Sequence, residues 1–469
     1  MPPIGLAYLA GALRQSGADV VILDLAARMR DFRPELLERV PDALAAAWED
    51  IRDARLVGIG PLVTATLQTT KVLVDAVRQL CDVPVVVGGP LCAVPHIDAV
   101  ADCYLGVDAS VSGDGEHPIV AMWEALRTGR LQPAPGVRLH GAQVVAPYRE
   151  KDLDTLPVPA RDLLDVPDYH ASARRALGMA RTTAVFLSRG CPYSCSFCAA
   201  PLSSGRQVRR FSRPRIEDEL RSCAELRFDN LVFYDDCLFV RSASLNERVI
   251  EFAEAVASSG WRGTYQLELR CDAVVGLDNE ALASLSETGC RQINMGIEKG
   301  SRPSLAQLRK RLLPDVAVAA CDRIQAAGIR SAGTFILGGV GETEDDLAAT
   351  IDFACGLALD LAHFNPLAIY PGTTLYREVF GDASWLDLCL DRVRAPLGDI
   401  LYESEQVPLS CLMRWVQTGY EAFYTASRLT GVLERTPDCE HQKLENTYRL
   451  LARERGHSWD VGSPVEWAC

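Results

Sequence analysis

The chain has 469 residues, 48% of them hydrophobic, which is enough for two or three domains with their own cores. Its formal charge of −14, without a cluster of basic residues, argues against unspecific binding to a nucleic-acid backbone and favours small-molecule partners. No apolar stretch is long enough to cross a bilayer, and the start lacks a secretory signal, so we expect a cytoplasmic protein without a membrane span.

Helical and strand patterns alternate over the first part of the chain. The predicted elements are a helix over 4–16, a strand over 20–25, a helical stretch to about 52, a strand over 56–61, a helix over 66–80 and a strand over 83–87. This order predicts an α/β, doubly wound, Rossmann-like domain with a parallel sheet. Ligands of such sheets bind beyond the carboxyl ends of the strands, where Thr64, Gly88, Gly89 and the loop 112–116 are expected.

A second α/β unit follows a stretch rich in Pro and Asp. Between about 129 and 180 short turns indicate an interdomain connector. Strands are then predicted over 184–188, 231–234, 264–268, 292–296, 330–337 and 363–369, which suggests a partial (β/α)6 barrel of the TIM type. Beyond about 372 the pattern is mostly helical. The predicted parts are a first domain over 1–135, a connector over 136–180, the barrel over 181–378 and a helical C-terminal domain over 379–469.

Three cysteines leave the first barrel strand on one tight loop. Cys191, Cys195 and Cys198 stand in the segment Arg-Gly-Cys-Pro-Tyr-Ser-Cys-Ser-Phe-Cys. Thiolates are the usual protein ligands of iron-sulfur clusters, and three ligands for four irons leave one iron open. The spacing fits neither paired Cys-x2-Cys zinc ligands nor the ferredoxin run with its fourth cysteine. A degenerate zinc site or three structural thiols is the alternative, and most of the remaining cysteines are expected to be reduced core residues.

The cysteine segment resembles the Cys-x3-Cys-x-aromatic-Cys signature of the radical S-adenosylmethionine (SAM) superfamily. The resemblance covers roughly 182–376 and implies a [4Fe-4S] cluster held by Cys191, Cys195 and Cys198. It also implies SAM as the source of a 5'-deoxyadenosyl radical and an electron donor such as flavodoxin or ferredoxin. Lys299 stands where the family commonly has Ser. The residues that the resemblance assigns to SAM binding are Phe197, Asp235, Asp236, Glu268, Arg270, Glu298 and Gly338.

The N-terminal part resembles the cobalamin-binding domain that precedes the radical domain in one large subgroup. The resemblance assigns cobalamin binding to Pro3, Gly5, Thr64, Gly88, Gly89, Gly113 and Glu116. Two features depart from the pattern. The strand expected before Pro2 is absent, so either translation starts upstream or the sheet lacks an edge. The Asp-x-His-x-x-Gly motif is also absent, so we expect cobalamin without a histidine lower ligand from that loop, with His96 in a solvated loop.

The two resemblances together imply a cobalamin-dependent radical SAM methyltransferase. Such an enzyme methylates an unactivated carbon or phosphinate of a small molecule through a 5'-deoxyadenosyl radical and methylcobalamin. A cobalamin-dependent cyclase or rearrangement enzyme without net methyl transfer is the second reading, and a methylthiotransferase with a cluster on Cys81, Cys92 and Cys103 is a third. A non-catalytic iron-sulfur module is disfavoured because it would not need the ordered motifs at the strand ends.

Substrate identity is not readable from the C-terminal region. Its aromatic residues at helical spacing are more typical of a core than of a substrate cage; they are Trp385, Tyr402, Trp415, Tyr420, Phe423 and Tyr424. The Ala- and Arg-rich composition suits natural-product tailoring by association only. Catalytic residues beyond the cluster ligands have no assignment.

Overall fold

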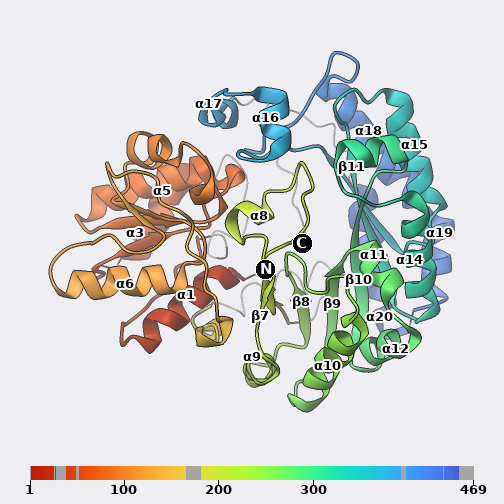
Figure 1. Cartoon of the computed structure of the whole chain (residues 1–469), viewed down its shortest axis with the longest axis horizontal. Coiled ribbons are helices and arrows are strands. Elements are labelled where there is room, and N and C mark those ends of the chain that lie inside the picture. Colours follow the sequence, from red (N-terminus) through yellow and green to blue (C-terminus); the bar gives the residue numbers. More distant parts are fainter. Residues whose placement is uncertain are drawn as a thin grey trace.

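The computed structural model describes residues 2–25, 27, 38–48, 52–164, 181–391, 398–436 and 438–453. Figure 1 shows two α/β bodies side by side, the N-terminal one in red and orange and the barrel in green and cyan. Helix α8 (Ala200–Ser203) lies between them, directly after the cysteine segment. Helices α18 (Leu409–Phe423), α19 (Ala426–Leu433) and α20 (Asp438–Arg453), in blue, lie against the outside of the barrel.

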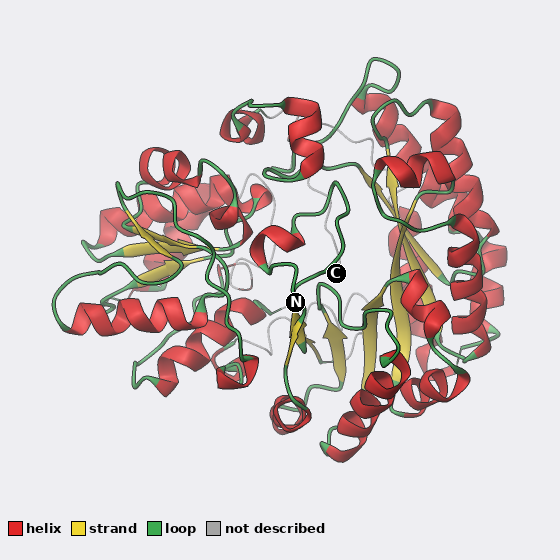
Figure 2. Ribbon diagram, viewed as in Figure 1, coloured by secondary structure: helices red, strands yellow, loops and turns green. Residues whose placement is uncertain are grey.

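The N-terminal body is a four-stranded sheet of order β1-β2-β3-β4, in which β4 alone is antiparallel. Val85 and Val87 of the central strand β2 belong to one core cluster and Val86 to another, because successive side chains point to opposite faces of the sheet. Helices cover both faces (Figure 2). The elements are α1 (Ile4–Gln15), α3 (Val40–Ala46), β1 (Val57–Ile59), α5 (Leu67–Leu80), β2 (Val85–Gly88), β3 (Ala109–Val111), α6 (Glu116–Arg127) and β4 (Val137–Leu139).

Two features of this body differ from the sequence prediction. The strand predicted over 20–25 is wrong: the described segment has no strand, and Val21 is 55% exposed. The segment has the β-branched residues of a strand, but among the described residues β1 is the edge of the sheet and pairs with β2 alone. Strands β3 and β4 were not predicted, because three residues each show too little alternation. Of the helical stretch predicted to residue 52, α3 is observed, while 28–37 and 49–51 lie outside the described residues.

The second body confirms the six predicted barrel strands. They form one parallel sheet of order β12-β11-β10-β9-β8-β5, whose first and last strands do not pair, so the barrel is open. A short antiparallel pair, β6 (Ser188–Arg189) with β7 (Arg209–Arg210), brackets the cysteine segment. The barrel strands are β5 (Thr182–Val185), β8 (Asn230–Phe233), β9 (Thr264–Leu269), β10 (Cys290–Glu298), β11 (Arg330–Leu337) and β12 (Leu361–Pro366).

Helices follow the barrel strands and continue to the end of the described chain. Those around the barrel are α9 (Arg213–Glu225), α10 (Leu245–Ser258), α11 (Cys271–Gly276), α12 (Asn279–Glu287), α13 (Arg302–Gln307), α14 (Pro314–Ala326) and α15 (Glu344–Gly356). The C-terminal region contains α16 (Thr374–Phe380), α17 (Trp385–Leu390), α18 (Leu409–Phe423), α19 (Ala426–Leu433) and α20 (Asp438–Arg453). No described helix combines the length and apolar composition that a membrane crossing requires.

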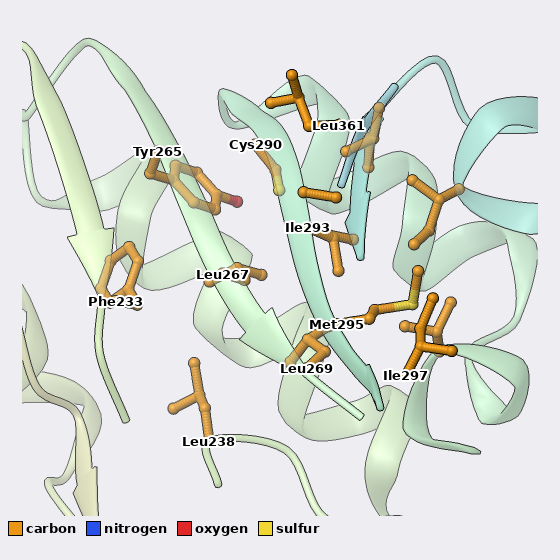
Figure 3. Packing of buried hydrophobic residues seen from close by; sticks show 14 of the residues in the cluster. Phe233, Leu238, Tyr265, Leu267, Leu269, Cys290, Ile293, Met295, Ile297 and Leu361 are labelled. Atoms are coloured by element: carbon orange, nitrogen blue, oxygen red, sulfur yellow. The ribbon is translucent and has the colours of Figure 1, made fainter. Parts of the chain in front are cut away.

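Alternation along the barrel strands separates an apolar helix-facing side from a polar side. In β9, Tyr265, Leu267 and Leu269 are buried in the core, whereas Gln266 and Glu268 point the other way. Figure 3 shows these apolar side chains packed with Ile293, Met295 and others of the same cluster. Of the C-terminal aromatics, Trp385, Tyr420, Phe423 and Tyr424 are buried, as expected, while Tyr402 is half-buried and Trp415 reaches Glu344.

A cluster of buried charges joins the two bodies beside the cysteine segment. Arg189 of β6 lies 3.1 Å from Asp114, in the loop after β3, and donates at 3.1 Å to Glu116, the first residue of α6. Arg209 of β7 binds Asp114 as well. Although burial opposes ionisation of Asp114, Arg189 and Arg209 hold its pKa below the usual value. The first sheet is therefore tied to the strand that carries the cysteines.

A second buried group ties the connector to the barrel. Arg161 is fully buried and donates to Glu219 of α9 and to the carbonyl oxygen of Ala184 at 2.9 Å. The Tyr8 hydroxyl of α1 donates to Glu219 at 3.4 Å. Because an unpaired buried charge is costly, each of these contacts requires its partners to stay in place.

The Arg189–Glu116 pair predicts a measurable stability effect. Glu116→Gln leaves the guanidinium without one of its two carboxylates, and we expect the free energy of unfolding in urea to fall by about 3 to 5 kcal/mol. The control is Asp162→Asn, which breaks the Arg14–Asp162 pair, whose side chains are 44% and 48% exposed. That change should cost at most about 1 kcal/mol. Equal costs for the two variants would contradict the role of Arg189 as a buried tie.

Candidate functional site

The cysteine loop depends on a glycine at its entry. Gly190 has φ of 103°, and a Cβ there would lie 2.3 Å from the carbonyl oxygen of Gln207. Its N–H donates to Asp236 at 3.0 Å, and the N–H of Cys191 donates to the carbonyl of Gly205 at 3.0 Å. A larger residue would therefore clash with the backbone and strain the left-handed conformation. This constraint explains why Gly precedes the first cysteine.

Ser196, between the second and third cysteines, anchors the loop to the barrel. It is fully buried; its N–H donates to the carbonyl of Leu308 at 2.9 Å and its hydroxyl to that of Gln307 at 3.1 Å. Its own carbonyl accepts from the N–H of Leu375 at 2.8 Å. Sequence reasoning missed Ser196, because a serine between two cysteines shows no sign of distant partners.

The three motif thiols are free and half-buried, and their protonation differs. Burial raises the pKa of Cys195, and that of Cys198 to about 11. A hydrogen bond from the Cys237 thiol lowers the pKa of Cys191 to about 7. Cluster ligation requires thiolates, so metal loading must displace protons from at least Cys195 and Cys198 at neutral pH. In the described part of the chain no three His, Cys, Asp or Glu side chains are placed to hold a single metal ion.

The paired aspartates after β8 lie beside this loop and have different tasks. Asp235 is buried; its Oδ1 accepts from the N–H of Leu187 at 3.0 Å and the hydroxyl of Ser188 at 2.6 Å. Its other oxygen is buried and has no hydrogen-bond partner among the described residues, and burial raises the pKa of Asp235 to about 7. Asp236 is exposed and accepts from Gly190. The pair thus fixes both ends of β6, and one oxygen of Asp235 is left for a ligand.

Polar side chains line the inner side of the barrel. Asn294 of β10 donates to Glu268 of β9 at 2.8 Å, and Gln292 donates to Gln266 at 3.2 Å. Burial raises the pKa of Glu268 to about 7. His363 of β12 is half-buried, and burial lowers its pKa. A TIM barrel is ordinarily filled with branched apolar residues, so this lining indicates a lumen that receives a polar ligand.

Further predicted SAM residues lie at the carboxyl ends of β9, β10 and β11. Glu298 is buried with φ of 70° and accepts from Lys310 at 2.6 Å. Arg270 lies 3.7 Å from the centre of the Tyr193 ring in the cysteine loop and donates to Asp272 at 2.9 Å. Gly338 has φ of 77°. Phe197 packs against the core cluster that extends from the first sheet.

Lys299, which replaces the family's usual Ser, is a buried structural cation. Its Nζ lies 2.7 Å from Glu342 and donates to the carbonyl of Gly338 at 3.2 Å. Burial lowers its pKa, and Glu342 opposes this effect. The second oxygen of Glu342 is buried without a partner. Lys299 therefore supports the turn at Gly338 from behind.

The carboxyl edge of the first sheet contains three of the predicted cobalamin residues, Thr64, Gly88 and Gly89. The loops after β1 and β2 are joined by the N–H of Leu62, which donates to the carbonyl of Gly88 at 2.8 Å. Gly89 has φ of 140°, and a Cβ there would lie 2.4 Å from the nitrogen of Leu62. Thr64 is buried and its hydroxyl donates to Asp399. Pro3 precedes α1 and Gly5 has open space around its Cα, so a flat ligand has room there.

Gly113 and Glu116, also predicted to bind cobalamin, lie where the two bodies meet. A Cβ on Gly113 would lie 2.0 Å from the carbonyl oxygen of Tyr148 in the connector. Glu116 is occupied by Arg189. His96 is exposed, as expected of a solvated loop residue. Sequence reasoning missed Arg189 as a joining residue, because opposite charges 73 positions apart show no sign of pairing.

Comparison with known proteins agrees with this geometry. The B12 binding domain family matches residues 1–122, and the radical SAM superfamily matches residues 185–354. The chain is a radical SAM enzyme with an N-terminal B12 binding domain. The fold of the whole enzyme resembles that of the radical SAM methyltransferase TsrM from Kitasatospora setae with cobalamin and a [4Fe-4S] cluster bound. The TM-score is 0.67 at 19% identity over 94% of this chain and 87% of that one.

Relatives of the enzyme include methyltransferases. An uncharacterized methyltransferase of Pyrococcus horikoshii is 29% identical over 80% of this chain and 78% of its own length. The hopanoid C-3 methylase of Methylococcus capsulatus is 28% identical, but the match spans 66% of this chain and only 56% of the methylase. An anaerobic magnesium-protoporphyrin IX monomethyl ester cyclase of Cereibacter sphaeroides is 23% identical over 91% of this chain and 68% of the cyclase.

The two families confirm the predicted cofactors, namely a [4Fe-4S] cluster, SAM and cobalamin. The described residues fit them: three thiols share one anchored loop, Asp235 has a buried free oxygen and the first sheet has a glycine-lined carboxyl edge. The thiols that a methylthiotransferase would need differ in their structural settings. Cys81 ends α5, Cys92 is buried after β2, and Cys103 is exposed.

The cysteine loop predicts the iron content of the protein. Anaerobic reconstitution should give about four irons per chain with a broad visible absorption shoulder, and C191A/C195A/C198A should abolish both. Iron and sulfide assays with absorption spectra test this. The matched control is Cys103→Ala, an exposed thiol outside the loop, which should leave the iron content unchanged. Full iron and sulfide in the triple variant would refute the cluster assignment.

The buried Asp235 predicts a pH-dependent stability of the protein without cofactors. Its pKa rises from 3.8 to about 7 on folding, so the stability from the neutral carboxyl is complete below pH 4 and is lost as pH rises through 7. We therefore expect the unfolding free energy of the wild type, relative to Asp235→Asn, to fall by roughly 2 kcal/mol between pH 5 and 8. Urea unfolding of both proteins at each pH measures it. A constant difference would show that Asp235 is ionised throughout.

Proposed function

We propose that the enzyme transfers a methyl group to an unactivated carbon, or a phosphinate, of a small molecule in a cobalamin-dependent radical reaction. The observation that carries the proposal is the pair of buried ion pairs that Arg189 forms with Asp114 and Glu116. It places the loop after β3 of the B12 binding domain against the strand that enters the cysteine loop. The ligand edge of one domain and the cluster loop of the other therefore share one interface.

The residues of the chain have separable roles in this proposal. Cys191, Cys195 and Cys198 would hold the cluster, Asp235, Glu268 and Glu298 would bind the cationic cofactor SAM, and Gly338 would border its adenine. Pro3, Gly5, Thr64, Gly88 and Gly89 border the cobalamin. When bound, the cluster and SAM would supply a 5'-deoxyadenosyl radical that removes a substrate hydrogen. Cobalamin would supply the methyl group.

Four predicted binding residues also hold the site in shape. Asp236 holds Gly190, and Arg270 packs over the Tyr193 ring while it donates to Asp272. Gly113 allows Tyr148 to approach, and Glu116 binds Arg189. The polar lining of Gln266, Gln292 and Asn294 lies deeper in the lumen and excludes a purely hydrocarbon filling. We also propose that the enzyme modifies a natural product in the cytoplasm.

The cyclase reading differs from methyl transfer in what each turnover consumes. If cobalt carries the methyl group, each methylated product should appear with one S-adenosylhomocysteine and one 5'-deoxyadenosine. The expected product from methyl-deuterated SAM contains all three deuterons, because the methyl group moves intact. The assay contains the reconstituted enzyme, cobalamin, a reductant and a small-molecule extract of the source cells. Its products are measured by mass spectrometry.

Two comparisons make this test decisive. C191A/C195A/C198A should give no 5'-deoxyadenosine and no labelled product, which separates enzymatic from background methylation. An extract-dependent product without label, formed with 5'-deoxyadenosine but without S-adenosylhomocysteine, would overturn methyl transfer in favour of cyclisation or rearrangement.

A further inference from the structure

An arginine-rich surface adjoins the outer side of the cysteine loop. A cavity of about 710 Å³ is lined by Ser194 of that loop and by Arg302, Arg309, Arg311 and Leu313 of the α13–α14 region. Ser194 is exposed and directly precedes the cluster ligand Cys195. The cavity therefore opens at the point where the cysteine loop meets solvent.

The charge of this surface is opposite to that of the whole chain. Arg302 pairs with Asp315 at 3.3 Å, and Arg309 with Glu378 of α16. Arg311 has no ion-pair or hydrogen-bond partner within the described ranges. Three arginines thus face two carboxylates on a protein whose formal charge is −14. An acidic partner is repelled by most of this molecule and attracted here.

The backbone holds these arginines in an unfavourable conformation. Arg309 and Arg311 have φ of 51° and 54°, in the left-handed region that non-glycine residues seldom occupy. Between them, Lys310 turns inward to Glu298 at 2.6 Å. The same segment accepts the hydrogen bonds of Ser196 through Leu308 and Gln307. The strained arginines are therefore fixed directly to the cysteine loop.

We propose that this surface, defined by Ser194, Arg302, Arg309, Arg311 and Leu313, docks an acidic one-electron carrier of the ferredoxin class. Exposed Leu313 supplies an apolar centre, and the arginines form a basic rim. Small, transient, electrostatically steered interfaces are typical of electron-transfer pairs. One electron leaves the reduced carrier, which becomes oxidised, and enters the cluster, whose charge falls by one without proton transfer.

The test measures cluster reduction in the reconstituted enzyme by stopped-flow absorption, with a reduced acidic ferredoxin or with dithionite. R302Q/R311N removes two cations. Because Asn tolerates the left-handed region, the variant keeps the fold. We expect the second-order rate with ferredoxin at low salt to fall about tenfold or more and to lose most of its salt dependence. Reduction by dithionite should change less than about twofold. The matched control, Arg221→Gln on α9, removes an arginine that is 52% exposed and should leave both rates unchanged.

Each outcome decides the proposal. An unchanged ferredoxin rate in R302Q/R311N, or an equal loss in the Arg221→Gln control, would overturn the docking surface. A loss with dithionite as well would assign the arginines to the cluster site instead. A wild-type dimer that R302Q/R311N converts to monomer would show that a second copy covers this surface. Because dithionite-driven SAM cleavage is independent of docking, the proposed methyl transfer can stand when the docking proposal fails.

Discussion

The guanidinium of Arg189 is the contact on which the arrangement of this enzyme depends. It lies two positions before the first cluster ligand and is held by two carboxylates of the B12 binding domain. Buried charges are tolerated only when paired, so the cation of one domain and the anions of the other stabilise each other only in the assembled state. The distance between the two cofactor regions is consequently set by an electrostatic joint, and the connector adds a second one through Arg161.

A second constraint keeps the cysteine loop rigid from the barrel side. Ser196 hydrogen-bonds to two carbonyls of the segment before Lys310, while Lys310 is tied to Glu298 at the end of β10. Movement of β10 is therefore transmitted to the loop, and the strain at Arg309 and Arg311 is stored where surface and cluster meet. This rigidity suits a loop that must hold three ligands in one geometry.

Local patterns predicted most of the fold but none of the contacts that join its parts. Periodicity identified the six barrel strands and α1 and α5, because each has enough residues to show its alternation. The strand expected over 20–25 fails because sheet formation needs a neighbour, which no local pattern reports. Cys191, Cys195 and Cys198 were readable because their function requires proximity in sequence, whereas Arg189, Arg161 and Ser196 act across more than 50 positions.

The raised pKa values of two carboxyl groups, Asp235 and Glu268, bear on which ligand the barrel would bind. Asp235 and Glu268 have pKa values raised to about 7 by burial, so without a counter-ion both are partly protonated near neutral pH. If Asp235 and Glu268 bind SAM as proposed, this cationic ligand stabilises their ionised forms and lowers both pKa values. Ligand binding must then release protons, and affinity must rise with pH across this range. Under this proposal the barrel favours a cation over a neutral molecule of the same shape, since only the cation recovers the free energy lost by burying two acids.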